Sequence, residues 1–289
     1  MSSTQQLKSR IRSVKITKQI TKAMQMVAAS KMRRAQDATK GSQPYAQTAN
    51  ELLTYLASQG GTRDHKWFVE RAVKTRMLIV VASDKGLAGA YNTNVLKSYI
   101  AALREDDRTH VKNETIAVGR KASQFVTRIK DTVIIGTYED IPDFPSGAQF
   151  HAILNTAKDA FEQQRVDAVD VIYTKFVSSM TQIADTIRLF PAGSTNTPVS
   201  ETVRESEFEP SPEEVLDDVA YRLIGSRLFQ AMLDARASEH SMRMLAMKNA
   251  TDNASDLIDD LTLEMNKERQ SAITQELAEI SGGVEAMNS

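Results

Sequence analysis

The residues with the clearest potential for chemistry lie in the segment Ser83–Gly89, which reads Ser-Asp-Lys-Gly-Leu-Ala-Gly. It follows an apolar run typical of a buried strand and precedes a stretch with helical spacing. A glycine-containing turn in that position can present backbone N–H groups to a phosphate. The segment nevertheless lacks both the Gly-Lys-Ser/Thr of a Walker A sequence and the Gly-x-Gly-x-x-Gly of a dinucleotide-binding turn. We therefore favour the other interpretation, in which the glycines let the strand and the helix pack closely.

Other side chains near this turn do not complete a catalytic site. Asp84 fits a helix-start carboxylate and Lys85 a surface base, but a receiver-like phosphoryl site would need further acids at other strand ends. Asp170 lies inside a predicted strand and does not qualify. Ser83 has no histidine nearby, and the Gly-x-Ser-x-Gly of a nucleophile elbow is absent. The sequence therefore predicts no catalytic residue.

The histidines and cysteines argue against a metal or thiol site. The histidines lie far apart in the sequence, at His65, His110, His151 and His240. None has a second histidine or a carboxylate at the spacing of a metal-binding pattern. There is no cysteine, which excludes disulfides and thiolate ligands and is typical of a reducing compartment. We expect no bound metal and no cofactor.

Length and composition bound the class of protein. With 289 residues the chain can form one large domain or two small ones, and its formal net charge of −1 favours no class of partner. No apolar run reaches the ~20 residues of a membrane span, and the N-terminus lacks the apolar core of a signal peptide. We expect a soluble intracellular protein, or one that partners hold at a membrane.

The element that organises the chain is a long predicted helix from Glu213 to Ser281, which contains no proline and only one glycine, Gly225. As one α-helix it would extend over roughly 100 Å, so it needs a partner along its whole length. Apolar and small residues three and four apart predict a coiled-coil seam. This seam comprises Leu228, Ala231, Ala235, Ser238, Met242, Leu245, Ala250, Ala254, Leu257, Leu261 and Met265. Short polar residues from Asn249 to Ser255 compete with a helix backbone, so two helices with a break near residue 250 are the alternative.

A second long helix is predicted from Ser3 to Ser58, with apolar residues on two faces. One stripe comprises Leu7, Ile11 and Val14, and the other, on nearly the opposite face, comprises Ile16, Ile20, Ala23 and Val27. A helix whose apolar face changes sides is expected to contact different partners along its length. Gly41 and Pro44 interrupt the pattern, and they are expected to kink or end the helix.

The charges of the two ends of the chain are complementary. Residues 1–36 carry only basic charges, whereas acids predominate in residues 252–289. This asymmetry predicts antiparallel contact between the two terminal helices. The basic stretch also fits a nucleic-acid interface, but its bases alternate with apolar residues rather than with stacking aromatics, so we expect no nucleic-acid partner.

Between the long helices, the pattern predicts a small α/β domain with a largely parallel sheet. Predicted strands span residues 77–82, 114–118, 132–138, 169–176 and 181–190. Predicted helices span residues 92–103, 120–129 and 149–163, residues 177–180 form a hairpin turn, and residues 191–212 form a loop. The fold class is therefore α + α/β: an antiparallel coiled coil of long N- and C-terminal helices with an inserted Rossmann-like α/β domain. Because the last helix is the longer one, roughly 20 Å of its C-terminal tip should remain unpaired, which would suit a closely fitting protein sleeve.

Four segments resemble the gamma subunit of the rotary F-type ATP synthase, of the bacterial type. The first helix of that family resembles residues 16–32 (ITKQITKAMQMVAASKM), and its last helix resembles residues 238–254 (SEHSMRMLAMKNATDNA) and 266–277 (NKERQSAITQEL). The turn at residues 83–89 is similar too. The family commonly has arginine where Lys85 stands and cysteine where Ala88 stands, and these departures leave the expected fold unchanged.

This resemblance implies a non-catalytic central rotor shaft that couples ion flow through a membrane ring to conformational cycling of the catalytic beta subunits. It implies one copy per complex inside a hexamer of three alpha and three beta subunits, with the epsilon subunit and the c-subunit ring at the α/β foot. The chain would be a peripheral membrane protein at the cytoplasmic face of the cell membrane, with no cofactor of its own. It also implies that the last helix stays continuous near residue 250.

The same resemblance implies a division of the chain and a set of contact residues. Residues 1–60 would be the N-terminal shaft helix, 75–192 the α/β domain, 193–212 the connecting loop and 213–289 the C-terminal shaft helix. The basic face of the first helix would meet acidic loops of the beta subunits, and Phe208 and Glu209 would lie near the foot. The candidate partner-contact residues are Lys18, Lys22, Met24, Lys31, Arg33, Arg34, Phe208, Glu209, Arg243, Arg269, Gln270 and Ile280.

Two other classes of function fit the sequence. One is a phosphate- or nucleotide-binding α/β domain with a helical dimerisation stalk, which stabilisation of the isolated chain by a nucleotide would support. The other is a coiled-coil tether or scaffold, which a stable homodimer without alpha or beta subunits would support.

Overall fold

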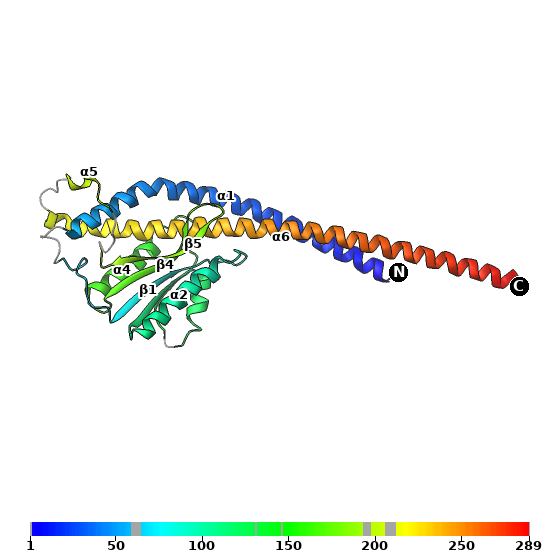
Figure 1. The fold of residues 1–289 in the computed structure, drawn as a ribbon, viewed down its shortest axis with the longest axis horizontal. Helices are drawn as coiled ribbons and strands as arrows, with labels where there is room; N and C mark the ends of the chain where they lie inside the picture. The colour runs from blue at the N-terminus through cyan, green and yellow to red at the C-terminus, as the bar shows by residue number, and fades with distance from the viewer. Residues whose placement is uncertain are drawn as a thin grey trace. The chain divides into compact units, whose positions relative to one another are not determined.

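The computed structural model describes residues 2–58, 65–130, 132–145, 147–192, 198–205 and 212–288. The chain divides into a helical unit, formed by Met1–Ala28 with Met244–Ser289, and a sheet unit, formed by Ala29–Arg243. Two long helices, α1 (Ser2–Ser58) and α6 (Pro212–Asn288), contribute residues to both units (Figure 1). They correspond to the two long helices that the sequence predicts.

The sheet unit contains a five-stranded mixed sheet in the order β3-β2-β1-β4-β5. The pairs β1–β2, β1–β4 and β2–β3 are parallel, whereas β4 and β5 form an antiparallel hairpin. The strands span Thr75–Val81 (β1), Lys112–Val118 (β2), Val133–Tyr138 (β3), Ala168–Phe176 (β4) and Gln182–Phe190 (β5). The predicted α/β insert with a largely parallel sheet is therefore confirmed.

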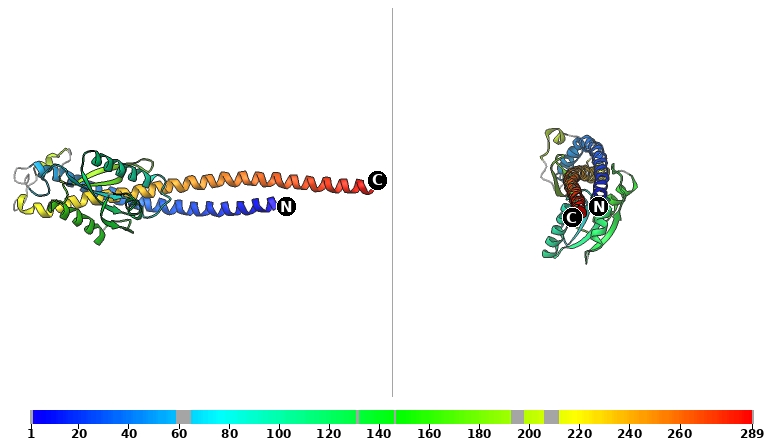
Figure 2. Two further views of the ribbon diagram at one scale, coloured as in Figure 1. Left: turned by 90° about the horizontal axis from the view of Figure 1, so that it is seen from below. Right: turned by 90° about the vertical axis from the view of Figure 1, so that its right-hand side faces the viewer.

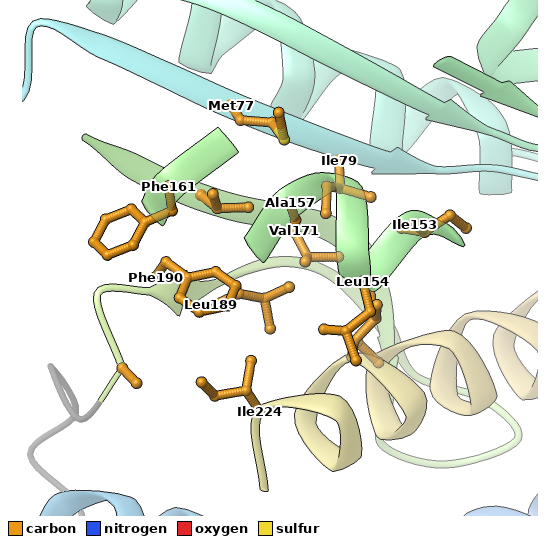
Figure 3. Packing of buried hydrophobic residues seen from close by; sticks show 14 of the residues in the cluster. Met77, Ile79, Ile153, Leu154, Ala157, Phe161, Val171, Leu189, Phe190 and Ile224 are labelled. Atoms are coloured by element: carbon orange, nitrogen blue, oxygen red, sulfur yellow. The ribbon is translucent and has the colours of Figure 1, made fainter. Parts of the chain in front are cut away.

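Side chains of β1 alternate between two apolar layers, because successive residues of a strand point to opposite faces of a sheet. Leu78 and Val80 belong to the layer formed with α2 (Tyr91–Arg108) and α3 (Arg120–Val126). Met77 and Ile79 belong to the other layer, to which α4 (Ala148–Glu162), α1 and α6 contribute (Figure 3). Burial on both faces explains why the sequence of β1 is a continuous apolar run.

The second of these layers holds both long helices against the sheet. Leu53 of α1 and Leu228 of α6 are fully buried in it together with Phe161 and Phe190. The rings of Phe161 and Phe190 stack with 5.2 Å between their centroids. Large buried apolar side chains thus fix α1 and α6 beside the sheet within this unit.

The prediction of a loop throughout residues 191–212 is wrong for one short stretch. Glu201–Arg204 form the helix α5, which follows Ser200 in an extended conformation. Val203 of α5 is buried, and the hydroxyl of Ser200 donates to Glu51 of α1 at 2.7 Å, so local contacts order this turn. The predicted contact residues Phe208 and Glu209 lie outside the described residues.

α1 continues through Gly41 and Pro44, so the prediction that they could end the helix is wrong, while a kink there stays a prediction. Both residues are exposed, and a Cβ added at Gly41 would meet no atom within 4 Å. Water can therefore solvate the carbonyl that loses its partner at the proline. On the opposite side Thr39, Ala46 and Ala49 are buried, and this packing keeps the helix continuous.

In the helical unit, α1 and α6 pack as the predicted antiparallel pair. Leu7 and Ile11 form an apolar cluster with Leu261, near the start of α1 and late in α6. Beyond this cluster α6 continues past the first turn of α1, and its residues 271–281 are almost all exposed (Figure 2). The structure thus contains the unpaired C-terminal tip that the lengths of the helices predict.

Two hydrogen bonds fix the register of the helix pair, one in each unit. The hydroxyls of Thr251 and Thr21 lie at hydrogen-bond distance, 2.8 Å, in the helical unit, and Ser42 donates to Gln230 at 2.6 Å in the sheet unit. The same number of residues separates Thr21 from Ser42 and Gln230 from Thr251. Each unit therefore has a side-chain contact that sets how α1 faces α6 within it.

α6 is continuous through residues 249–255, so the alternative of two helices is wrong. Thr251 and Ser255 donate their hydroxyls to the carbonyls four residues earlier, at 2.8 and 3.0 Å. These short polar side chains therefore bond within the helix instead of replacing its backbone bonds.

The predicted seam of α6 is wrong for Leu245 and Leu257, which are exposed. It is correct for the buried Leu228, Ala231, Ala235, Ser238, Ala254 and Leu261 and for the partly buried Met265. The inward-facing line instead comprises Met247, Thr251, Ala254, Ile258, Leu261 and Met265. The difference arises because Thr251, although polar, is buried with its hydroxyl satisfied.

The second apolar stripe of α1 remains exposed within this chain. Ile16, Ile20 and Val27 are exposed, whereas Leu7 and Ile11 of the first stripe are buried. Among the described residues, no helix has the length and apolar character needed to cross a membrane.

Candidate functional site

The Ser83–Gly89 turn lies at the carboxyl end of β1, beside the ends of β2 and β3. Ala82 donates its backbone N–H to Val118 at 2.9 Å, and Gly119 donates to Tyr138 at 2.7 Å, so the three strand ends are tied together. Ligands of open α/β sheets bind outside this edge, so a phosphate site would form here.

An arginine of α6 occupies this edge instead. Arg243 donates from Nη2 to the carbonyls of Lys85 and Gly86 at 3.1 and 3.3 Å. Its guanidinium therefore lies against backbone acceptors, whereas a phosphate needs backbone N–H donors. Ser83 is buried, and its hydroxyl donates to the carbonyl of Lys85 at 2.7 Å. This geometry argues against a phosphate site. The close packing predicted for the glycines is not found at Gly86 either, because a Cβ added there would meet no atom within 4 Å.

Asp84 joins three segments at the same edge. Its Oδ1 accepts the backbone N–H groups of Arg120 and Asp140, both at 3.0 Å. Its Oδ2 lies 3.3 Å from Nη2 of Arg236 on α6. Arg120 is the first residue of α3, so Asp84 is a helix-start carboxylate for α3 rather than for the helix that follows the turn.

Three charged residues on one face of α6 form a network with these loops. Arg236 and Arg243 both pair with Glu239, at 2.9 and 2.8 Å, and Arg236 also donates to the carbonyl of Ile141. The three side chains are between 5% and 12% exposed. Burial would lower the pKa of Arg236, but Glu239 and Asp84 outweigh this effect and raise it. Charge-assisted hydrogen bonds in such a dry site hold the groups in a defined geometry.

A second network joins α1, the loop after β3 and α6. Lys31 pairs with Asp143 at 2.9 Å, and His240 contacts the other oxygen of Asp143 at 3.0 Å. Burial would raise the pKa of Asp143, but the hydrogen bond from Lys31 and the contact with His240 lower it to about 2. Burial lowers the pKa of His240, so its ring is neutral at neutral pH. Its Nε2–H then donates to Asp143, and its Nδ1 accepts from Arg243 at 3.4 Å.

Replacing Lys31 by methionine should lower the free energy of unfolding at pH 7 by about 0.5–1 kcal/mol, because a partly exposed ion pair is lost. The pKa of Asp143 is lowered in the folded state, so the pair stabilises the protein above the ordinary aspartate pKa. That stabilisation is lost as pH falls toward about 2, where the folded-state pKa lies. Urea denaturation should show the difference shrinking below pH 4, with Lys40→Met, an exposed change on α1, as control. A difference that stays constant on acidification would contradict the role of this pair.

The remaining predicted contact residues lie along the two long helices. On α1, Lys18 and Met24 are partly buried, and the exposed ones are Lys22, Arg33 and Arg34. On α6 the exposed ones are Arg269, Gln270 and Ile280. The structure thus brings Lys31 and Arg243 together through Asp143 and His240, and leaves the others on helix surfaces.

Three residues that complete the networks, Asp143, Arg236 and Glu239, are not among the sequence-predicted site residues. Arg236, Glu239 and Arg243 stand three and four apart with alternating charge, which is the spacing of ion pairs on a helix face and is visible in the sequence. Asp143 has no such signal, because it lies in a loop that only the fold brings to α6.

Three of the four histidines, His65, His151 and His240, make structural contacts, and His110 is an exposed turn residue. His65 contacts Asp217 at 2.6 Å, and His151 packs edge-on against the ring of Phe150. In the described part of the chain, no group of three or more His, Asp or Glu side chains is arranged to hold a metal ion.

Comparison with known proteins identifies relatives over the full length. A family model described as ATP synthase matches residues 3–287. The chain is 38% identical to the ATP synthase gamma chain of Stenotrophomonas maltophilia (strain R551-3) over 288 residues, which cover 99% of this chain and 100% of the relative. The ATP synthase gamma chain of Staphylococcus epidermidis (strain ATCC 35984) is 37% identical over the same shares.

Solved structures share the fold. A chain in the Tetrahymena thermophila mitochondrial ATP synthase central stalk and c-ring has a TM-score of 0.60 at 25% identity, and the match covers 80% of this chain and 99% of that chain. A chain in the Euglena gracilis mitochondrial ATP synthase has a TM-score of 0.68 over 99% of this chain and 95% of that chain, at 18% identity, and this likeness concerns the fold alone. The full-length family match and the identity to bacterial gamma chains lead to one assignment: the chain belongs to the ATP synthase gamma chain family.

Proposed function

We propose that this chain is the non-catalytic central rotor shaft of an F-type ATP synthase, where it couples ion flow through the membrane ring to conformational cycling of the catalytic beta subunits. Full-length similarity to gamma chains carries the proposal. The long helices add support, since apolar residues such as Ile20 and Ile273 remain exposed on them. Exposed apolar residues along a helix pair are typical of a surface that partner proteins cover.

Coupling in this proposal follows from unequal contacts. α1 and α6 differ in sequence, so a turning shaft presents a different face to each beta subunit in turn. A face shifts a beta subunit only if it binds one conformation of that subunit more tightly than the others. Rotation thereby drives each nucleotide site through binding, synthesis and release, while this chain holds no nucleotide and catalyses no step.

The proposed partners are three alpha and three beta subunits around the helices, with the epsilon subunit and the c ring at the foot and one copy of this chain per complex. Association with the membrane is indirect, at the cytoplasmic face of the cell membrane. The match to a central stalk and c-ring structure supports this placement. In this scheme residues 1–60 and 213–289 are the shaft helices, 75–192 the foot and 193–212 the connecting loop.

The proposed contacts with these partners lie mainly on the long helices. Positive charge and exposure at Arg33 and Arg34 support contact with acidic loops of beta subunits. The full set along the helices is Lys18, Lys22, Met24, Lys31, Arg33, Arg34, Arg243, Arg269, Gln270 and Ile280, with Phe208 and Glu209 near the foot.

Purification of this chain from gently solubilised membranes tests the proposal, when subunit stoichiometry and ATPase activity are measured together. Three alpha and three beta subunits per copy, with the ATPase activity residing in beta, are expected. A free homodimer, or a complex without ATPase activity, would overturn the rotor assignment. Stabilisation of the isolated chain by ATP would instead favour the nucleotide-binding alternative, against which the Arg243–carbonyl contacts argue.

Reversing the charge at Arg33 and Arg34 to glutamate should lower ion pumping per ATP hydrolysed by about fivefold, near the lower end of typical coupling free energies. The reason is that the shaft loses its attraction to acidic partner loops. The readout is the ratio of ATP-driven ion uptake to ATP hydrolysis in membrane vesicles. Lys40→Glu, an exposed reversal farther along α1, is the matched control. If the ratio of ion uptake to ATP hydrolysis is unchanged in the double variant, these arginines do not take part in coupling.

A further inference from the structure

We infer that the contacts between α6 and the loops at the strand ends form a torsional clamp, through which torque passes between the α/β domain and the long helices. The clamp comprises Asp84, Ile141, Asp143, Arg236, Glu239, His240 and Arg243. Torque exists only in a rotor, so this inference rests on the proposed function. It gives the Ser83–Gly89 turn a mechanical role in place of the phosphate-binding role that its position first indicated.

From one face of α6, the clamp reaches the ends of three of the four parallel strands, β1, β2 and β3. Residues Arg236, His240 and Arg243 stand four and three apart, so their side chains leave the helix on the same side. Arg243 bonds the turn after β1, while Arg236 bonds both Asp84 of that turn and the carbonyl of Ile141 after β3. Asp84 in turn holds the backbone at the start of α3, which follows β2.

The chemistry of the clamp differs from that of the apolar layer beside it. Leu228, Ala231 and Ala235 of α6 pack into the core cluster that includes the sheet. Such apolar burial is non-directional, so it holds α6 against the sheet but sets the rotation of the helix less sharply than directional bonds do. Hydrogen bonds weaken steeply once their angle or length departs from the optimum. A roll of α6 about its axis therefore disrupts the bonds of Arg236 and Arg243, and the clamp adds directional resistance to that of the apolar layer.

The same clamp includes α1. Lys31 of α1 pairs with Asp143, and Asp143 also contacts His240 of α6. His240 in turn lies within 3.4 Å of Arg243. One loop of the α/β domain therefore holds both long helices at the same level, and neither helix can turn against that loop without breaking a charged contact.

The position of the clamp along α6 fits this role. Arg243 is the last residue of α6 that belongs to the sheet unit. The hydrogen bonds and ion pairs of the clamp thus lie in the last two turns of α6 within that unit. A twisting force on the helix would act on these turns first. Arg236 and Glu239 are nearly buried there, so water does not readily replace their bonds.

The test uses Arg236→Lys in the assembled complex in membrane vesicles. Lysine keeps the charge, but one ammonium group cannot bond Glu239, Asp84 and the carbonyl of Ile141 together as the planar guanidinium does. ATP hydrolysis and ion pumping are measured against an increasing opposing ion gradient. We expect hydrolysis within about twofold of the unmodified complex and pumping per ATP reduced about fivefold at the steepest gradient. With no opposing gradient the ratio should be nearly unchanged, because little torque is then transmitted.

Two further variants make the outcome decisive. Arg222→Lys, an exposed change on α6 outside the clamp, is the matched control. Asp143→Asn weakens the arm to α1 at a partly exposed site, so it carries less risk to folding, and the same load-dependent loss is expected. If hydrolysis and pumping both fell in proportion to the amount of assembled complex, the substituted residues would have a purely structural role, and this would overturn the clamp. So would an unchanged ratio at every gradient. A wrong rotor assignment would give a different result from a wrong clamp. In that case the unmodified chain itself would lack alpha and beta partners or ATP-linked pumping.

Discussion

Replacing Gly119 by alanine should lower the free energy of unfolding by about 3 kcal/mol or more, the largest single-residue effect that we expect in this chain. Gly119 has a φ of +89°, and an added Cβ would lie 2.2 Å from the carbonyl oxygen of Ala82. Ala82 is itself bonded to Val118 across the β1–β2 edge, so the backbone cannot retreat without breaking that contact. Urea denaturation should show a lower midpoint with an unchanged slope.

Substitutions at two other glycines distinguish the two causes of this loss, which are backbone strain and steric contact. Gly147 has a φ of +94° but nothing within 4 Å of an added Cβ, so Gly147→Ala should show backbone strain alone. We expect that strain to cost about 1 kcal/mol. Gly86 has no positive φ, and a Cβ added there would meet no atom within 4 Å. Gly86→Ala should therefore leave the free energy of unfolding nearly unchanged. Equal losses at Gly119 and Gly147 would show that the contact with Ala82 has no energetic weight.

Replacing Asp234 by asparagine should raise the free energy of unfolding at pH 8 by about 2–3 kcal/mol, which corresponds to a shift of roughly two pKa units. Asp234 lies on α6 and is only 7% exposed. Burial raises its pKa to about 6, although a hydrogen bond from Gln230 and the charge of Lys175 oppose the shift. The side-chain amide of Gln230 donates a hydrogen bond to Oδ1 of Asp234 at 3.0 Å, and asparagine keeps an oxygen that can accept it. Asparagine is uncharged, so the cost of burying a charge is removed.

The pH dependence of this substitution has a definite sign. The folded state holds the Asp234 proton more tightly than the unfolded state, in which the pKa is near its ordinary value of 3.8. Asp234 therefore disfavours folding above about pH 6, and this penalty fades as pH falls toward 4. The stability difference between Asp234→Asn and the unmodified chain should accordingly shrink from pH 8 to pH 4.5. Asp218→Asn, an exposed change on α6, is the control, and a less stable Asp234→Asn protein at pH 8 would refute the prediction.

Much of the fold follows from local patterns in the sequence. The apolar run at residues 77–82 predicts β1 because a strand buried on both faces has no polar alternation. The long helices follow from apolar residues three and four apart. The errors arise where tertiary packing overrides a local preference. Pro44 does not end α1 because its side is exposed, and Thr251 lies in the seam because a hydrogen bond satisfies its hydroxyl.

The candidate site was less accessible to prediction, because its residues are far apart in the chain. The turn at residues 83–89 could be singled out, but its partner Arg243 is separated from Lys85 by 158 positions. Asp143 is 112 positions from Lys31 and 97 from His240, and no local pattern links them. Such contacts depend on the handed crossovers and the sheet order, which place strand ends beside α6 only after the whole sheet has formed.

The antiparallel pairing of α1 and α6 within each unit constrains how the length of this chain can change during evolution. A single inserted residue turns the rest of an α-helix by about 100°, which would move every following inward side chain to the outside. Between Thr21 and Ser42, or between Gln230 and Thr251, an insertion in one helix alone would also separate one of the two hydrogen-bonded pairs. Viable length changes in these stretches should therefore be matched on both helices and close to multiples of about seven residues, the repeat after which a helix face returns. The tip of α6 from residue 271 onward is exempt from this rule, because its described side chains are almost all exposed, and there its length is free to follow its partners.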